Sequence, residues 1–246
     1  MSARELDAAG IFDPNLRASY LECKRLNSLH GKTYYLATLL LPPGKRPFVH
    51  ALYGFARYAD EIVDDLSSTL PLEEKAEVLR RWSDQLLDDL AKGASLDHIG
   101  AALVDTVHRF EIPLEHFRAF LPSMAMDISV TRYENYSALM EYVYGSAAVI
   151  GLEMVPILGP LADEAYPAAE KLGIAFQLAN FIRDVDIRCK LNNRVDGDHP
   201  RRNNIIRNEF AKAGATIIYE DGDLDIPIAL EFKDEALGTW FLMKWT

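Results

Sequence analysis

The chain has 246 residues, 49% of them hydrophobic, and a formal net charge of −11. This length and apolar content predict one folded domain with a buried core and argue against a disordered chain. The acidic balance argues against a nucleic-acid partner, whose phosphates require a basic surface.

The cysteines and the apolar stretches suggest where the chain works. Cys23 and Cys189 are too few for a disulfide framework, so we expect a cytoplasmic protein. The first ten residues lack the apolar core of a secretory signal. The most apolar long stretch, residues 147–162, contains Glu153 and is shorter than a membrane span requires. We therefore expect no segment to cross a bilayer, and peripheral attachment to a membrane stays an open alternative.

The predicted elements are mostly helices. Residues 1–15 are expected to form a loose lead-in. Amphipathic patterns and turn residues then predict helices at about 16–29, 46–66, 72–91, 100–110, from 113, and 167–185, with two more between 124 and 159 that join near 133–137.

A small basic cluster opens the segment HGKTYYLATLLLPPGKRP, residues 30–47. His30 and Lys32 could donate hydrogen bonds to a phosphate. Alternatively, these cations only decorate a helix end, where positive charge suits the helix dipole. The segment alone does not decide between the two interpretations.

The central predicted helix contains FARYADEIVDD, which places Arg57, Asp60 and Asp64 at i, i+3 and i+7 on one face. Carboxylates a turn apart repel each other on an exposed helix. A hard cation such as Mg²⁺ could bind between the two carboxylates and keep coordination positions for substrate phosphates. The alternative is a solvated acidic face on a plain helical protein.

A later helix repeats this layout in QLANFIRDV, where Gln177, Asn180 and Asp184 follow the same spacing and Arg183 is adjacent. The surrounding segments are apolar, so two solvated surfaces explain the repetition poorly. A polar stripe that faces inward on a bundle helix is typical of a ligand or metal site. The repetition therefore favours a site over a solvated face for both helices.

Two further regions allow more than one interpretation. Tyr142 is either a core aromatic residue with a satisfied hydroxyl or a catalytic residue. Residues 191–204 read as a polar linker or loop, and residues 215–246 contain β-like runs with a turn-prone Asp-Gly-Asp. We expect a C-terminal tail with short β-strands.

The chain resembles the squalene/phytoene synthase family over about residues 16–186. The resemblance lies in HGKTYYLATLLLP, ALYGFARYADEIVDD, MDISVTRYENYSALMEYVYGSAAVIG and QLANFIRDV, in this order. It implies a single all-α domain of isoprenoid-synthase type, in which two aspartate-rich helices face each other across a central cavity. The implied division is this domain at 16–186 and a divergent tail at 187–246.

The resemblance also implies an activity. Family members bind two prenyl diphosphates through Mg²⁺ (Mn²⁺ is an alternative) and condense them head to head through a cyclopropyl diphosphate. With geranylgeranyl diphosphate the product is phytoene, made without NADPH, as in carotenoid biosynthesis. The sequence leaves the prenyl chain length and the oligomeric state open.

The site residues are carried over position by position. The implied metal ligands and catalytic carboxylates or amides are Asp60, Asp64, Asn180 and Asp184, with Tyr142 as a cavity tyrosine near the reacting carbons. The implied diphosphate contacts are His30, Lys32, Thr33, Arg57, Gln177 and Arg183.

One departure from the family pattern favours a second hypothesis. The position of a second aspartate, four residues after Asp184, holds Arg188. A cation there would oppose Mg²⁺ binding and could pair with Asp184 instead. The tail also lacks the family's closing helices. The alternative is therefore an inactive or non-catalytic relative that serves as a lipid-binding or assembly module.

Overall fold

The computed structural model describes residues 2–64, 71–130, 133, 135–192, 215–220 and 223–232; for residues 2, 64, 182–192 and both strands it describes the backbone alone. The described chain divides into two compact units, residues 1–174 and 175–246.

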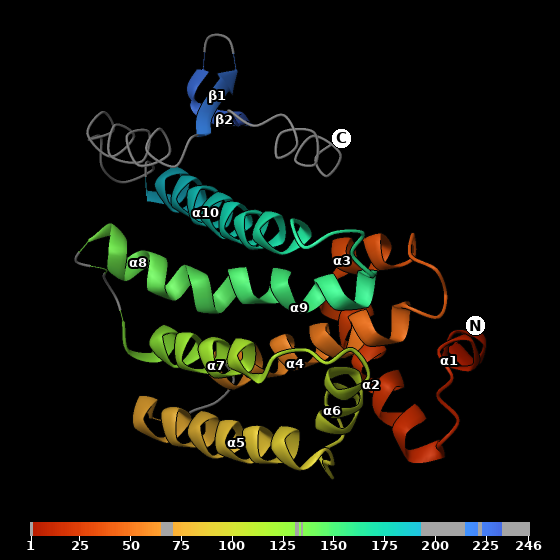
Figure 1. Cartoon of the computed structure of the whole chain (residues 1–246). Helices are drawn as coiled ribbons and strands as arrows, with labels where there is room; N and C mark the ends of the chain where they lie inside the picture. The colour runs from red at the N-terminus through yellow and green to blue at the C-terminus, as the bar shows by residue number, and fades with distance from the viewer. Residues whose placement is uncertain are drawn as a thin grey trace. The chain divides into compact units, whose positions relative to one another are not determined.

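The first unit is built from helices (Figure 1). They are α1 (Ser2–Ala8), α2 (Pro14–His30), α3 (Lys32–Thr38), α4 (Arg46–Asp64), α5 (Leu72–Lys92), α6 (Gly100–Arg109), α7 (Leu114–Ser129), α8 (Tyr136–Val143), the π-helix η1 (Tyr144–Ala148), α9 (Val149–Leu158) and the first part of α10 (Ala165–Asn192). The predicted all-α class and the predicted helix positions from residue 16 onward are confirmed.

Helix α4 lies at the centre of this unit and contacts α2, α5, α6, α7 and α9. Its Phe55 is fully buried, with ring centroids 4.7 Å from Phe120, 5.4 Å from Phe117 and 6.0 Å from Trp82. Aromatic rings at these separations add favourable edge and stacking contacts to the burial of apolar area. The apolar face of α4 is thus fixed in the core, which sets the direction of its polar face.

The helices begin and end where the turn residues predict. Asp13 caps α2 by accepting a hydrogen bond from the Leu16 amide at 2.8 Å, and Pro14 occupies the first turn, where its missing N–H costs nothing. Gly93 ends α5 in the left-handed conformation, with φ 77°. Local chemistry alone accounts for these boundaries.

The first fifteen residues correct the expectation of a loose lead-in. Residues 2–8 form the helix α1, and Asp7 pairs with Arg17 of α2 at 2.7 Å. Arg17 also donates to the Ile11 carbonyl at 2.8 Å. Tertiary ion pairs therefore hold a segment whose own sequence has no marked helical period.

The run α8–η1–α9, residues 136–158, is a continuous helix of 23 residues, and its most apolar window of 18 residues has a mean hydropathy of 1.3. By length and composition alone it could cross a membrane, which the estimate from residues 147–162 missed. However, 44% of its most apolar window is buried inside the protein, as in the central helix of a bundle. Such a core helix passes the same test of length and composition.

The second unit contains the rest of α10 and a hairpin of β1 (Ala215–Glu220) and β2 (Asp223–Phe232). The strands are antiparallel, with Ala215 opposite Phe232, and the register shifts around Tyr219. The predicted short strands are thus present in the tail. Helix α10 continues past residue 186 to Asn192. The division into a domain at 16–186 and a tail at 187–246 stays a prediction. The final β-like run, residues 238–246, lies outside the described residues, as does most of the predicted linker.

Candidate active site

The polar face of α4 carries a connected cluster of charged side chains. Arg57 Nη1 donates to Asp60 Oδ2 at 2.7 Å, and Arg57 Nε donates to Glu61 Oε1 at 3.2 Å. The side chain of Asp60 is 43% exposed and that of Arg57 27%. Asp64 follows one turn after Asp60 at the end of the described helix, where only its backbone is described. The structure thus confirms that Arg57 and Asp60 share a face of α4, and it adds a direct bond between them.

The end of α2 joins this cluster. His30 is the last residue of α2, and its Nε2 lies 3.5 Å from Glu61 Oε1. Lys32 and Thr33 follow in the first turn of α3, and both are exposed. The structure thus brings the basic segment and the acidic helix to one place in the first unit. A cluster of this kind presents both cations and hard oxygen ligands to a diphosphate.

Gly31 makes this junction possible. A Cβ at this position would lie 2.5 Å from the ring of Tyr53 on α4. A side chain at residue 31 would therefore force the Tyr53 ring or the start of α3 to shift. Because α3 begins at the next residue, the close approach at Gly31 places its first turn beside the cluster.

Tyr53 and Glu61 are two residues of this cluster that the sequence analysis did not select. Tyr53 lies one turn before Arg57, and burial raises its pKa, with further contributions from the nearby Asp60 and Glu61 carboxylates that Arg57 opposes. The rings of Tyr34 and Tyr53 lie 6.2 Å apart. The signal was available in the sequence, because residues 53, 57 and 61 share the i, i+4 spacing of one helix face.

Tyr142 lies in α8 and is buried, with 6% exposure. Burial raises its pKa, and the Asp127 carboxylate, which accepts its hydrogen bond, raises it further. The centroids of the Tyr142 and Tyr133 rings lie 5.5 Å apart. The hydroxyl is therefore protonated and oriented, which fits both a core residue and a residue that presents a fixed O–H dipole.

The second motif lies in α10, within the second unit. Asn180 Nδ2 donates to Gln177 Oε1 at 3.4 Å, and both side chains are partly buried. This bond confirms that residues 177 and 180 share a face of the helix. Arg183, Asp184 and Arg188 lie in the helical part of α10, where only the backbone is described.

The donors of both motifs fit Mg²⁺ in chemical type. This ion prefers oxygen ligands and is commonly held by one or two carboxylates, with water and substrate phosphates completing the shell. Among the side chains that the structure describes, no three His, Cys, Asp or Glu residues converge as a metal site. Each motif by itself offers two such ligands, so water or other oxygen ligands would have to complete the shell of an ion bound there.

Comparison with known proteins shows which family the chain resembles. The model of a family described as squalene/phytoene synthase matches residues 28–195. Phytoene synthase 1 of the Arabidopsis thaliana chloroplast is 35% identical over 209 residues, which cover 81% of this chain and 46% of that protein. This chain therefore spans about half the length of the curated relative.

Two solved structures resemble the computed structure. A dehydrosqualene synthase solved in complex with a ligand has 30% identity and a TM-score of 0.61, covering 72% of this chain and 60% of that one. A squalene synthase of Alicyclobacillus acidocaldarius has 24% identity and a TM-score of 0.64, covering 75% of this chain and 68% of that one. The second likeness concerns the fold alone.

Proposed function

This chain belongs to the squalene/phytoene synthase family, and from that premise we propose that it condenses two prenyl diphosphates head to head. The proposed substrate is geranylgeranyl diphosphate and the proposed product is phytoene, formed through a cyclopropyl diphosphate without NADPH. The observation that carries the proposal is the cluster of Arg57, Asp60, Glu61 and His30, next to the exposed Lys32.

The residues of this cluster would bind the diphosphate together. Arg57, His30, Lys32 and Thr33 supply hydrogen-bond donors that hold the diphosphate and offset its charge as it leaves. Because Arg57 already bonds Asp60 at 2.7 Å, the carboxylate is oriented before a ligand arrives. A fixed charge that needs no reorganisation is worth more to the transition state than a mobile one.

Metal ligands in this proposal come from both motifs. Asp60 and Asp64 on α4, and Asn180 and Asp184 on α10, would bind Mg²⁺, with Mn²⁺ as a substitute. When bound, the ion would stabilise the negative charge that develops on the leaving diphosphate. Gln177 and Arg183 would add further donors to the diphosphate.

Tyr142 is the proposed cavity residue near the reacting carbons. Its hydroxyl is buried and hydrogen-bonded to Asp127, so it presents an oriented dipole rather than a mobile proton donor. An apolar environment around such a group would keep water away from a carbocation.

The proposal is tested by incubating the full chain with geranylgeranyl diphosphate, with and without Mg²⁺, and measuring both pyrophosphate and C40 hydrocarbon. Phytoene formed only with Mg²⁺ is the expected result. Release of pyrophosphate without phytoene would mean that the chain ionises the substrate but does not condense two molecules of it. Farnesyl diphosphate in a parallel incubation determines the preferred chain length.

Arg188 supports a second candidate, a non-catalytic relative that binds a prenyl lipid or assembles with partners. This residue lies one turn after Asp184 in α10, where a positive charge opposes a metal ion. The variant Arg188→Asp separates the two candidates. If the wild-type chain is inactive and Arg188→Asp gains Mg²⁺-dependent turnover, Arg188 has disabled the site. An active wild-type chain rejects the non-catalytic candidate.

A cytoplasmic location with attachment to a membrane surface completes the proposal. The substrate carries a long apolar chain, and two leucines that follow Lys32 in the chain are exposed. Leu36 in α3 is 64% exposed, and Leu40, just after α3, is 88% exposed. Flotation with phospholipid vesicles tests this part. Leu40→Ser should reduce the bound fraction, whereas a wild-type chain that stays in the aqueous fraction would exclude the attachment.

A further inference from the structure

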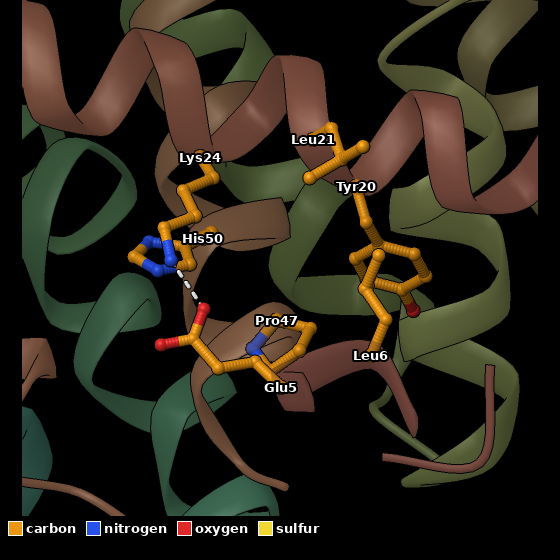
Figure 2. Close-up of a pocket in the computed structure, with 7 residues that line it drawn as sticks. All are labelled: Glu5, Leu6, Tyr20, Leu21, Lys24, Pro47 and His50. Carbon is orange, nitrogen blue, oxygen red and sulfur yellow. Dashed lines mark hydrogen bonds and ion pairs between the residues drawn. The ribbon is translucent and has the colours of Figure 1, made fainter. Parts of the chain in front are cut away.

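A buried ion-pair cluster holds the N-terminal helix against the rest of the first unit. Glu5 of α1 is 5% exposed. Lys24 of α2 donates to one of its carboxylate oxygens, and Arg46 of α4 donates to the other at 3.1 Å. Figure 2 shows Glu5 pointing to Lys24, with His50 alongside, in a small pocket. Burial opposes ionisation of Glu5, but the hydrogen bonds from Lys24 and Arg46 outweigh it and hold the pKa below its ordinary value.

The same Arg46 also binds the end of α3. Its Nη2 donates to the Leu39 carbonyl at 2.7 Å, and its Nε donates to the Leu41 carbonyl at 2.8 Å. Carbonyls at the end of a helix have no partner within the helix. One guanidinium therefore connects the carboxylate of α1 to the last carbonyls of α3 and the turn after it.

The middle of α3 rests on the same cluster. The ring of Tyr35 stacks on that of His50, with centroids 5.8 Å apart and an angle of 23° between the planes. Lys24 Nζ lies 6.0 Å from the centroid of Tyr35. His50 is 1% exposed and is held by Asn27 at 3.0 Å. The side of α3 thus rests on His50 and Lys24 and its end on Arg46, and Glu5 binds both Lys24 and Arg46.

We propose that α1 acts as a positioning strap for α3, with Glu5 as the positioning residue that fixes Lys32 and Thr33 for diphosphate binding. This inference rests on the proposed function for its consequence. Helix α3 has only seven residues, and a helix this short is marginal without tertiary contacts. The close approach at Gly31 sets where α3 begins, whereas the direction of its first turn depends on the contacts along its length.

Removing the charge of Glu5 would release α3 through a defined step. Lys24 and Arg46 would become partly buried cations without their shared counter-ion, an arrangement that a protein avoids by hydrating or moving the side chains. When Arg46 turns towards solvent, the Leu39 and Leu41 carbonyls lose their donor. The end of α3 then frays, and Lys32 and Thr33 lose their fixed positions.

The test compares Glu5→Gln with wild type in two measurements on the full chain. Amide hydrogen exchange without any ligand should speed up about tenfold in α3, while α5 is unchanged. Binding of inorganic pyrophosphate with Mg²⁺ should weaken by about tenfold in Kd. The matched control is Glu22→Gln, the same substitution at a carboxylate that pairs within α2, with Arg25 at 2.8 Å, and not with α1, Lys24 or Arg46. It should leave both measurements unchanged.

A second variant covers the case in which Glu5→Gln does not fold. Arg46→Lys keeps the charge opposite Glu5 but cannot bind the carboxylate and both carbonyls together, so it should also loosen α3. Equal α3 exchange in the wild type and in the folded variants would overturn the proposal, as would an equal effect of Glu22→Gln. If the wild type fails to bind pyrophosphate, the proposed function fails, and the exchange measurement still decides whether α1 positions α3.

Discussion

Glu153 is fully buried in α9, and neither of its carboxylate oxygens has a hydrogen-bond partner among the residues that the structure describes. Burial alone raises its pKa well above the ordinary value of 4.5. The folded protein therefore binds this proton more tightly than the unfolded chain. The raised pKa therefore lowers the free energy of unfolding very little below pH 4.5. It lowers this free energy more and more as the pH rises from 4.5 towards the folded-state pKa.

The prediction at the residue scale is that Glu153→Met stabilises the protein at neutral and alkaline pH. Methionine has a similar volume without a polar group to bury, so the gain should be about 1–3 kcal/mol at pH 8 and should shrink towards pH 4.5. Urea unfolding at both pH values measures it. Glu115→Met, at a side chain that is 75% exposed on α7, should show no such pH-dependent gain. A destabilised Glu153→Met variant at pH 8 would mean that the carboxyl has a partner in solution.

At the scale of elements, the π-helix η1 is packed against α7 through Gly145. A Cβ on Gly145 would lie 2.0 Å from Ser123 Oγ and 2.4 Å from the Ala119 carbonyl oxygen. The second of these atoms belongs to the backbone and cannot rotate away. This contact joins α7 to the run α8–η1–α9, which holds Tyr142.

We therefore predict that Gly145→Ala destabilises the protein by about 1–3 kcal/mol, because the two helices must separate. Thermal unfolding followed by circular dichroism measures this change. Ser137→Ala, at an exposed position of α8, is the control and should shift the midpoint little. An unchanged midpoint for Gly145→Ala would show that α7 moves aside at no cost.

Across the whole molecule, the sequence predicted the helices that have a strong apolar period or clear end signals. It missed α1 because that helix depends on the tertiary ion pairs of Glu5 rather than on its own propensity. It also missed η1, because a π-turn leaves no mark in a 3.6-residue period. Arg57 and Asp60 were predicted from their spacing, whereas the link from Glu61 to His30 joins two helices and needed the structure.

The central claim is that the α4 cluster binds the diphosphate together with Mg²⁺. The measurement that tests it most directly is calorimetric binding of inorganic pyrophosphate, with and without Mg²⁺, to wild type, Asp60→Asn and Asp84→Asn. Asp84 is the matched control, because it pairs with Arg80 at 2.7 Å on the exposed face of α5. The account predicts Mg²⁺-dependent binding that weakens at least about tenfold in Asp60→Asn and is unchanged in Asp84→Asn. Equal binding by wild type and Asp60→Asn, or wild-type binding that does not need Mg²⁺, would contradict it.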